Sequence, residues 1–360
     1  MKLPRLTLLA TLMLTAPAAA QLQIAPPVTT PSAPAEKPKP RPHTITKKKE
    51  AAPAPKPSAS PKPAVSPKPA LPATVIPAPA TDTPGIDLVF GAYQRGQYKT
   101  AFDLAAERAK AGDPKAMTML GELYSNAMGI RRDYGKALEW YKHAADAGDR
   151  EAMFALAMMR MSGRGGPVDK PEAVKLMASA AKLGEPKAAY NLALLYLDGQ
   201  TLPQDVRRSA ELLRQAADAG LPEAQYALAT FYKEGTGVPK DLDKAVRLLQ
   251  AASLADNVDA EVEYAIALFN GTGTPKNQPA AVAMLRKASR QGSAIAQNRL
   301  AWVLINGMGT SVDKVEGFKW HLVAKTAGKG DPELDKQFSD LPAEDRAKAE
   351  AAAKKWLGTK

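Results

Sequence analysis

The sequence predicts an all-α protein, a right-handed α-solenoid of six 36-residue helix-turn-helix repeats, preceded by a proline-rich segment without a packed core. Alanine recurs at six positions that lie 36 residues apart, starting at Ala116. Such a fixed period indicates stacked repeats, each of which buries its apolar face against its neighbours. Eighteen of the 31 prolines lie between Pro26 and Pro84, and proline removes a backbone donor. The packed part is therefore expected to follow that segment.

Residues 1–20 have the order of a bacterial secretory signal peptide. Basic Lys2 and Arg5 precede an apolar run from Leu6 to Leu14, and alanines at 18–20 form a cleavage site. The apolar stretch is shorter than the roughly 20 residues that a spanning helix needs. We expect cleavage after Ala20 and a periplasmic protein, with secretion as the alternative. No later segment is apolar enough to span a membrane, so the mature chain is expected to have no transmembrane segment.

Residues 21–84 consist mainly of Pro, Lys and Ala, with repeated Pro-Lys-Pro triplets. Few large apolar side chains are present, so burial cannot offset the entropy of ordering this segment. We expect a disordered tether with a bias toward polyproline II. Three roles remain open: a plain spacer, a ligand for an aromatic groove, and a weak contact with anionic envelope components through its Lys side chains.

Residues 85–112 are expected to form an N-terminal capping pair of helices. Asp87–Arg95 and Lys99–Lys110 have helical patterns and are joined by Gly96-Gln97-Tyr98. This pair lacks the glycine-rich turn of the repeats that follow it.

The first helix of each repeat carries apolar or small residues 0, 4, 5 and 8 positions from the recurring alanine, which is the spacing of one helix face. The residue at position 4 is Leu except for Tyr264, and the residue at position 5 is always Gly or Ala. Position 8 is aromatic or leucine except for Arg160. The small residue is expected to let a neighbouring helix approach closely.

A turn with two glycines follows in most repeats, with Ala127 and Thr201 as exceptions. The glycine pair follows a helix rather than a strand, so a phosphate loop is not expected. An Asp or Asn stands 17 residues after each alanine, and we expect it to cap the second helix rather than bind metal. Glu172 and Glu316, three residues further on, predict capping boxes. The predicted caps are Asp133, Asp169, Asp205, Asp241, Asn277 and Asp313.

The second helix of each repeat is expected to pack through a large apolar residue and an alanine four positions later. A glycine follows it in five repeats, which is typical of the C′ position of a helix. Asp256 replaces this glycine in the fifth repeat and predicts a looser helix end there. Residues 332–360 are expected to form C-terminal capping helices, the last of which is Ala-rich, runs to Trp356 and carries a charged outer face. The whole solenoid then has about sixteen helices.

The 36-residue unit resembles the Sel1-like repeat, a relative of the tetratricopeptide repeat. The resemblance rests on segments such as AAYNLALLYLDG at 188–199 and GTGVPKDLDKA at 235–245, and it covers residues 113–331. Arg160, Thr201 and Tyr264 depart from the family pattern. The resemblance implies a non-enzymatic adaptor or regulator whose first helices line a concave groove.

By this resemblance, the groove positions lie two, six and nine residues after each recurring alanine. They predict an apolar strip that binds a protein or peptide partner, while packing within the solenoid is the alternative role for these side chains. The predicted contact residues are Phe154, Met158, Met161, Tyr190, Leu194, Tyr226, Ile266, Phe269, Trp302 and Ile305.

The residues that carry chemistry are few. The chain has no Cys, which excludes disulfides, iron–sulfur clusters and thiol nucleophiles. Its three His are scattered, and no catalytic motif stands in a suitable context. We therefore expect no enzyme activity, no metal and no cofactor. Residues 1–84 hold 11 of the 49 basic and 3 of the 37 acidic residues. The remainder is nearly neutral, so no nucleic-acid partner is expected.

These observations predict an exported, non-enzymatic scaffold or regulator of the bacterial envelope that holds a partner protein or peptide in its groove. One alternative is an envelope- or wall-associated structural spacer that is bound through the basic tether. Another is a secreted effector that binds host proteins. Removal of residues 21–84 separates the first two hypotheses, because only the spacer would lose its attachment.

Overall fold

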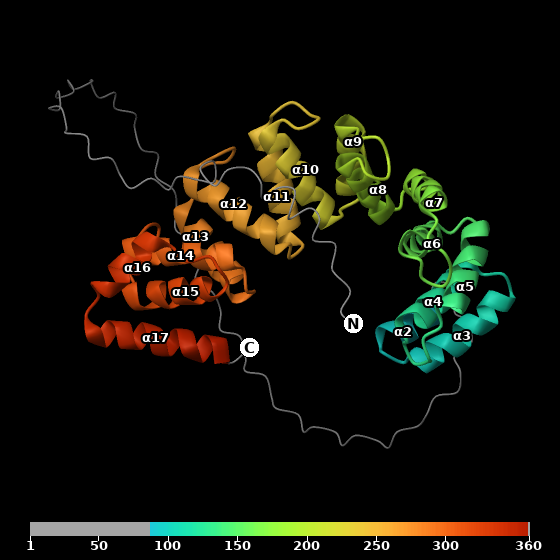
Figure 1. The fold of residues 1–360 in the computed structure, drawn as a ribbon, viewed down its shortest axis with the longest axis horizontal. Coiled ribbons are helices and arrows are strands. Elements are labelled where there is room, and N and C mark those ends of the chain that lie inside the picture. Colours follow the sequence, from blue (N-terminus) through green and yellow to red (C-terminus); the bar gives the residue numbers. More distant parts are fainter. Residues whose placement is uncertain (1–86, 359–360) are drawn as a thin grey trace, which may run out of the picture. The chain divides into compact units, whose positions relative to one another are not determined.

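The computed structural model describes residues 87–358, and the predicted signal peptide and tether lie outside these residues. Within the described range the chain forms sixteen α-helices and no strand (Figure 1). Successive helices from α2 to α15 pack on one another and α16 and α17 both pack on α15, which confirms the predicted all-α solenoid. None of the helices between residues 87 and 358 has the length and hydrophobicity needed to cross a bilayer.

Each repeat contributes an A helix and a B helix of 13 residues each, and the six pairs are numbered units 1 to 6 in chain order. The A helices are α4 (Pro114–Asn126), α6 (Arg150–Ser162), α8 (Pro186–Asp198), α10 (Pro222–Glu234), α12 (Val258–Asn270) and α14 (Ala294–Asn306). The B helices are α5 (Tyr134–Asp146), α7 (Lys170–Lys182), α9 (Val206–Asp218), α11 (Leu242–Leu254), α13 (Gln278–Arg290) and α15 (Lys314–Thr326). The flanking helices are α2 (Leu88–Gln94), α3 (Tyr98–Lys110), α16 (Pro332–Ser339) and α17 (Ala343–Gly358).

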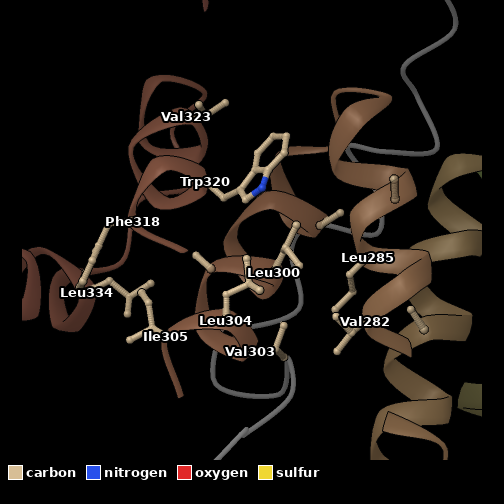
Figure 2. Packing of buried hydrophobic residues seen from close by; sticks show 14 of the residues in the cluster. Val282, Leu285, Leu300, Val303, Leu304, Ile305, Phe318, Trp320, Val323 and Leu334 are labelled. Carbon is tan, nitrogen blue, oxygen red and sulfur yellow. The ribbon is translucent and has the colours of Figure 1, made fainter. Parts of the chain in front are cut away.

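The core lies between the A and B helices and continues from each unit into the next. All six recurring alanines of the A helices are at most 2% exposed, so the helices approach closely at these points. Figure 2 shows this packing near the C-terminal end, where Leu300 and Leu304 of α14 lie among side chains of α13, α15 and α16. Helix α17 covers the other side of α15. The last repeat therefore buries its apolar face on the C-terminal helices.

The predicted caps of the B helices are confirmed. In every unit the Asp or Asn side chain accepts a hydrogen bond from the backbone N–H three residues later, at 2.9–3.1 Å. The capping boxes predicted for Glu172 and Glu316 are wrong. The backbone N–H of Asp169 donates to the Arg160 carbonyl at 3.0 Å, and that of Asp313 donates to the Leu304 carbonyl at 2.9 Å. No free N–H is left at the cap for the glutamate side chain.

The looser helix end predicted at Asp256 is also wrong. Helix α11 has the same 13 residues as the other B helices, and Asp256 adopts the left-handed conformation itself, with φ of 58°. The Asn257 N–H donates to the Ala252 carbonyl at 3.1 Å, as the corresponding N–H does in the other units. Lys287 pairs with the Asp256 carboxylate at 2.9 Å. Aspartate tolerates this conformation better than most residues, so the turn keeps its geometry without glycine.

The second glycine of the A–B turn allows contact between neighbouring units. Gly237, with φ of 66°, lies so close to α9 that an added Cβ would be 2.6 Å from the Val206 carbonyl oxygen. The turn of unit 4 therefore rests on the first residue of the B helix in unit 3. Equivalent glycines in units 2, 5 and 6 contact α5, α11 and α13 in the same way.

Candidate protein-binding face

The ten predicted contact residues lie on one face of the A helices, because positions two, six and nine of a helix point to the same side. We call this surface the A-helix face. Eight of the ten side chains are half-buried, which leaves part of each in contact with solvent: Phe154, Met158, Met161, Tyr190, Leu194, Tyr226, Ile266 and Trp302. Phe269 and Ile305 are only 8% and 6% exposed.

Phe269 and Ile305 belong to the core rather than to a contact surface. Both lie in the hydrophobic cluster that α12 to α17 share. Gly317 of α15 leaves the space that Ile305 fills, since an added Cβ there would lie 2.6 Å from Ile305 Cγ1. The expectation that these two residues contact a partner is corrected accordingly, because too little of either side chain reaches the surface.

Trp302 has a structural contact that the sequence analysis missed. Its indole Nε1–H donates to Asp331 Oδ2 at 2.9 Å. Asp331 also caps α16 by accepting from the backbone N–H of Glu333 at 2.9 Å. Trp302 therefore ties α14 to the C-terminal helices, and both it and Ile266 pack against the core cluster of that end.

The other six side chains form a half-buried apolar patch on three successive A helices. Helix α6 contributes Phe154, Met158 and Met161, helix α8 contributes Tyr190 and Leu194, and helix α10 contributes Tyr226. We call this set the α6–α10 strip. It combines aromatic rings with flexible Met and Leu side chains, a composition that adapts well to an apolar partner.

Polar bridges between A-type helices lie on either side of this strip. Tyr93 of α2 donates to Glu122 of α4 at 2.7 Å, and Lys233 of α10 pairs with Glu263 of α12 at 3.1 Å. The partners are 29 and 30 residues apart, less than one repeat, because the last turn of one helix meets a position inside the next A helix. A search for complementary polar residues at this separation would have found them, whereas comparison at intervals of 36 could not.

The two tyrosines of the strip keep their protons at neutral pH. Burial, followed by the charge of Glu223, raises the pKa of Tyr190. Burial, followed by the charges of Glu263, Asp259 and Glu234, raises the pKa of Tyr226. Each ring therefore presents a neutral hydroxyl group, which can donate a hydrogen bond to a ligand.

The structure shows no grouping of three His, Asp or Glu between residues 87 and 358 that could hold a metal ion. His143 is exposed on α5. His321 is buried on α15, and its Nε2 lies 2.9 Å from Asp335 Oδ1 of α16. The two described histidines thus lie in different parts of the solenoid, as the sequence predicts.

Comparison with known proteins places the repeats in a family. The model of the Sel1 repeat matches six consecutive segments, residues 114–149, 150–185, 186–221, 222–257, 258–293 and 294–329. The crystal structure of a Sel1 repeat protein from Oxalobacter formigenes is similar, with 27% sequence identity and a TM-score of 0.59 over 66% of this chain and 98% of that one.

The crystal structure of c5321, a protective antigen present in uropathogenic Escherichia coli strains, shares the fold. It has 23% identity and a TM-score of 0.51 over 72% of this chain and 64% of that one. A search of curated proteins gives no match.

Proposed function

The chain belongs to the Sel1 repeat family, and from this premise we propose that it is an exported, non-enzymatic scaffold or regulator of the bacterial envelope. Solenoids of this repeat type generally mediate protein–protein interactions, and they are typically not catalytic. The order of basic, apolar and small residues in positions 1–20 supports export to the periplasm. The partner is a protein or a peptide segment that binds the A-helix face.

The α6–α10 strip is the observation that carries this proposal. Half-buried aromatic and thioether side chains lie on three neighbouring A helices whose opposite faces already supply the core. Partly exposed apolar side chains at equivalent positions of neighbouring helices are typical of interaction sites. A partner segment with apolar side chains would bury Met158 and Leu194, while the neutral hydroxyl groups of Tyr190 and Tyr226 would donate to its backbone carbonyls.

Photo-crosslinking in the source cells tests this surface directly. Benzoylphenylalanine at Met158 should capture one predominant partner. The same group at Lys175, whose side chain is 77% exposed on α7, serves as the control position. Equal capture at both positions, or at neither, would place the interaction elsewhere.

The affinity for the captured partner should fall when the strip is truncated. Met158→Ala and Leu194→Ala should each weaken binding by about 1–2 kcal/mol if they are central contacts. Titration calorimetry measures this loss, and it should depend little on salt because apolar contacts are less sensitive to screening than ion pairs. Val174→Ala, at a half-buried position on α7, is the matched control and should leave the affinity unchanged.

The same variants distinguish the scaffold from packing alone and from a tethered spacer. If the strip only stabilises the fold, Met158→Ala and Leu194→Ala would lower the melting temperature, and the folded fraction alone would explain their affinity. If the chain is a spacer held by residues 21–84, deletion of that segment would release it from the envelope, and the strip variants would remain attached.

A further inference from the structure

A second surface lies where the A–B turn of unit 2 meets the start of α5 in unit 1. The ring of Tyr134, the first residue of α5, contacts two guanidinium groups. Arg132 Cζ lies 5.7 Å and Arg164 Cζ lies 5.9 Å from the ring centroid. Arg132 comes from the turn of unit 1 and Arg164 from the turn of unit 2, so this cluster exists only because the two units stack.

Close backbone packing brings a third arginine to the same place. Gly165, with φ of 78°, lies so near the Tyr134 carbonyl that an added Cβ would overlap it. Its neighbour Gly166 lies beside the last turn of α6, where Arg160 Nη1 would be 3.4 Å from an added Cβ. We call Arg132, Arg160 and Arg164 the arginine patch.

The charges of this patch are not neutralised within the folded part of the chain. Among residues 87–358, no carboxylate oxygen lies within 4.0 Å of any of the three guanidinium groups. The nearest carboxylates along the chain, Asp133 and Asp169, each accept a backbone N–H at 3.0 Å as helix caps. Arg132 is exposed, and the other two are half-buried.

The fold itself does not require these arginines. The position of Arg160 is occupied in the other units by Tyr124, Tyr196, Tyr232, Leu268 and Leu304. The position of Arg164 is occupied there by the uncharged residues Met128, Gln200, Thr236, Thr272 and Met308. The position of Arg132 holds lysine in units 4 and 5 and an uncharged residue in units 2, 3 and 6, so the fold requires an arginine at none of the three positions. Departures from a repeat pattern that bring no gain in packing are expected at functional sites.

We propose that the arginine patch is a docking site for an acidic peptide segment of a partner protein. Guanidinium groups bind carboxylates through paired hydrogen bonds, and cation–π contact with Tyr134 brings two of them to the same ring. Residues 1–84 hold 11 basic and 3 acidic residues, so they do not supply an acidic segment, and we assign this segment to a partner. The site goes beyond the proposed function, because it lies on the A–B turns of units 1 and 2 and the last turn of α6 and includes no residue of the α6–α10 strip.

A dye placed beside the patch in the full chain provides a local measurement. The chain has no Cys, so Pro167→Cys gives one labelling site in the exposed turn of unit 2. Pro239→Cys labels the equivalent exposed position in unit 4. Each labelled protein is titrated with octaglutamate, with octaglutamine as the neutral control. The dye at 167 should give a saturable change with octaglutamate only, and the dye at 239 should give none.

Charge-matched variants then assign the binding to these residues. In the Pro167→Cys protein, Arg132→Gln with Arg164→Gln should weaken octaglutamate binding at least about tenfold. Lys240→Gln with Lys276→Gln removes two charges from exposed turns of units 4 and 5. This double variant should change the affinity for octaglutamate less than about twofold. Arg164→Lys keeps the charge but loses the planar group, and it should bind with intermediate affinity.

Three results would overturn the proposal. One is an equal loss in both double variants, which would indicate a general effect of net charge. Another is the absence of a response to octaglutamate at position 167. The third is a response to phosphatidylglycerol vesicles without a response to the peptide, which would assign the patch to a membrane surface. Melting curves identify any variant that fails to fold. In that case the octaglutamate affinity of Arg164→Lys is compared with that of the protein that keeps all three arginines.

Discussion

Glu261 places a carboxylate where units 4 and 6 have glutamine. Gln225 and Gln297 each donate from Nε2 to a backbone carbonyl eight residues earlier, at 3.3 and 3.1 Å. Glu261 is 1% exposed, its Oε2 accepts no hydrogen bond, and Lys287 Nζ lies 3.6 Å away. Burial raises the pKa of Glu261, and the charge of Lys287 opposes this only in part. The ionised carboxylate is therefore poorly stabilised in the folded state.

Glu261→Gln should consequently stabilise the protein at neutral pH. Folding raises the pKa of Glu261, so the protonated side chain contributes fully to stability below the unfolded pKa of 4.5. This contribution is lost as the pH rises through the pKa of the folded state. We expect a melting temperature about 2–4 °C above wild type at pH 7, and a difference that shrinks toward pH 4. Thermal denaturation across this range measures it. A difference in melting temperature that does not change with pH would show that ionisation of Glu261 does not destabilise the folded state.

The sequence predicted which face each A-helix residue occupies, but not how deeply it is buried. Phe269, Ile305 and Met161 all lie nine residues after the recurring alanine, yet only Met161 remains partly exposed. The difference comes from neighbouring helices. Gly317 opens the space that Ile305 fills. Helix periodicity defines a direction, whereas burial depends on side chains that are distant in sequence.

At the scale of the helix, interactions within about four residues were predictable and more distant ones were not. The Asp and Asn caps were identified because the bond to the N–H three residues later is local. The capping box at Glu172 failed because the N–H of Asp169 bonds to the carbonyl of Arg160, in the preceding helix. Contact with the preceding unit holds this turn in place, and the local sequence pattern does not reveal that contact.

Two glycine variants separate backbone strain from contact between units. Gly220 and Gly237 both have positive φ, of 85° and 66°, but only Gly237 lies against another unit. Gly220→Ala should cost about 1 kcal/mol through the strained backbone alone. Gly237→Ala should cost about 1–3 kcal/mol more, since its Cβ would meet the Val206 carbonyl. Urea denaturation compares the two, and equal losses would mean that the turn does not rest on α9.

For the molecule as a whole, the period of 36 was sufficient to predict the solenoid. It fixed the number of units, their helix pairs and their order. The polar bridges between successive A-type helices were not predicted, because their partners lie 29–31 residues apart and cross the repeat boundary. These bridges, together with Phe269 and Ile305, divide the A-helix face and limit the candidate site to the α6–α10 strip.

A loss of packing at the C-terminal end should show how far destabilisation spreads along the solenoid. Trp356 of α17 packs on Trp320 of α15 with ring centroids 5.0 Å apart, and Lys319 Nζ lies 4.3 Å from the Trp320 ring centroid. Trp356→Ala should lower the stability by about 2–3 kcal/mol, less than for a fully buried ring. Because each unit contacts only its neighbours, hydrogen exchange should accelerate in α14 to α17 and stay unchanged in α3 to α5. Equal acceleration of hydrogen exchange in all of these helices would indicate that the solenoid unfolds as one cooperative unit.

The uniform unit length makes recombination between repeats compatible with the fold. All twelve repeat helices have 13 residues, and the A–B turns of units 2, 4, 5 and 6 each contact the unit before them. Loss of residues 186–221 by unequal crossing-over would join α7 to α10 with the same register and the same type of contact. The arginine patch would remain whole, while Tyr190 and Leu194 would disappear from the A-helix face. A change in gene length by one repeat could thus alter which partners are bound and leave the architecture intact.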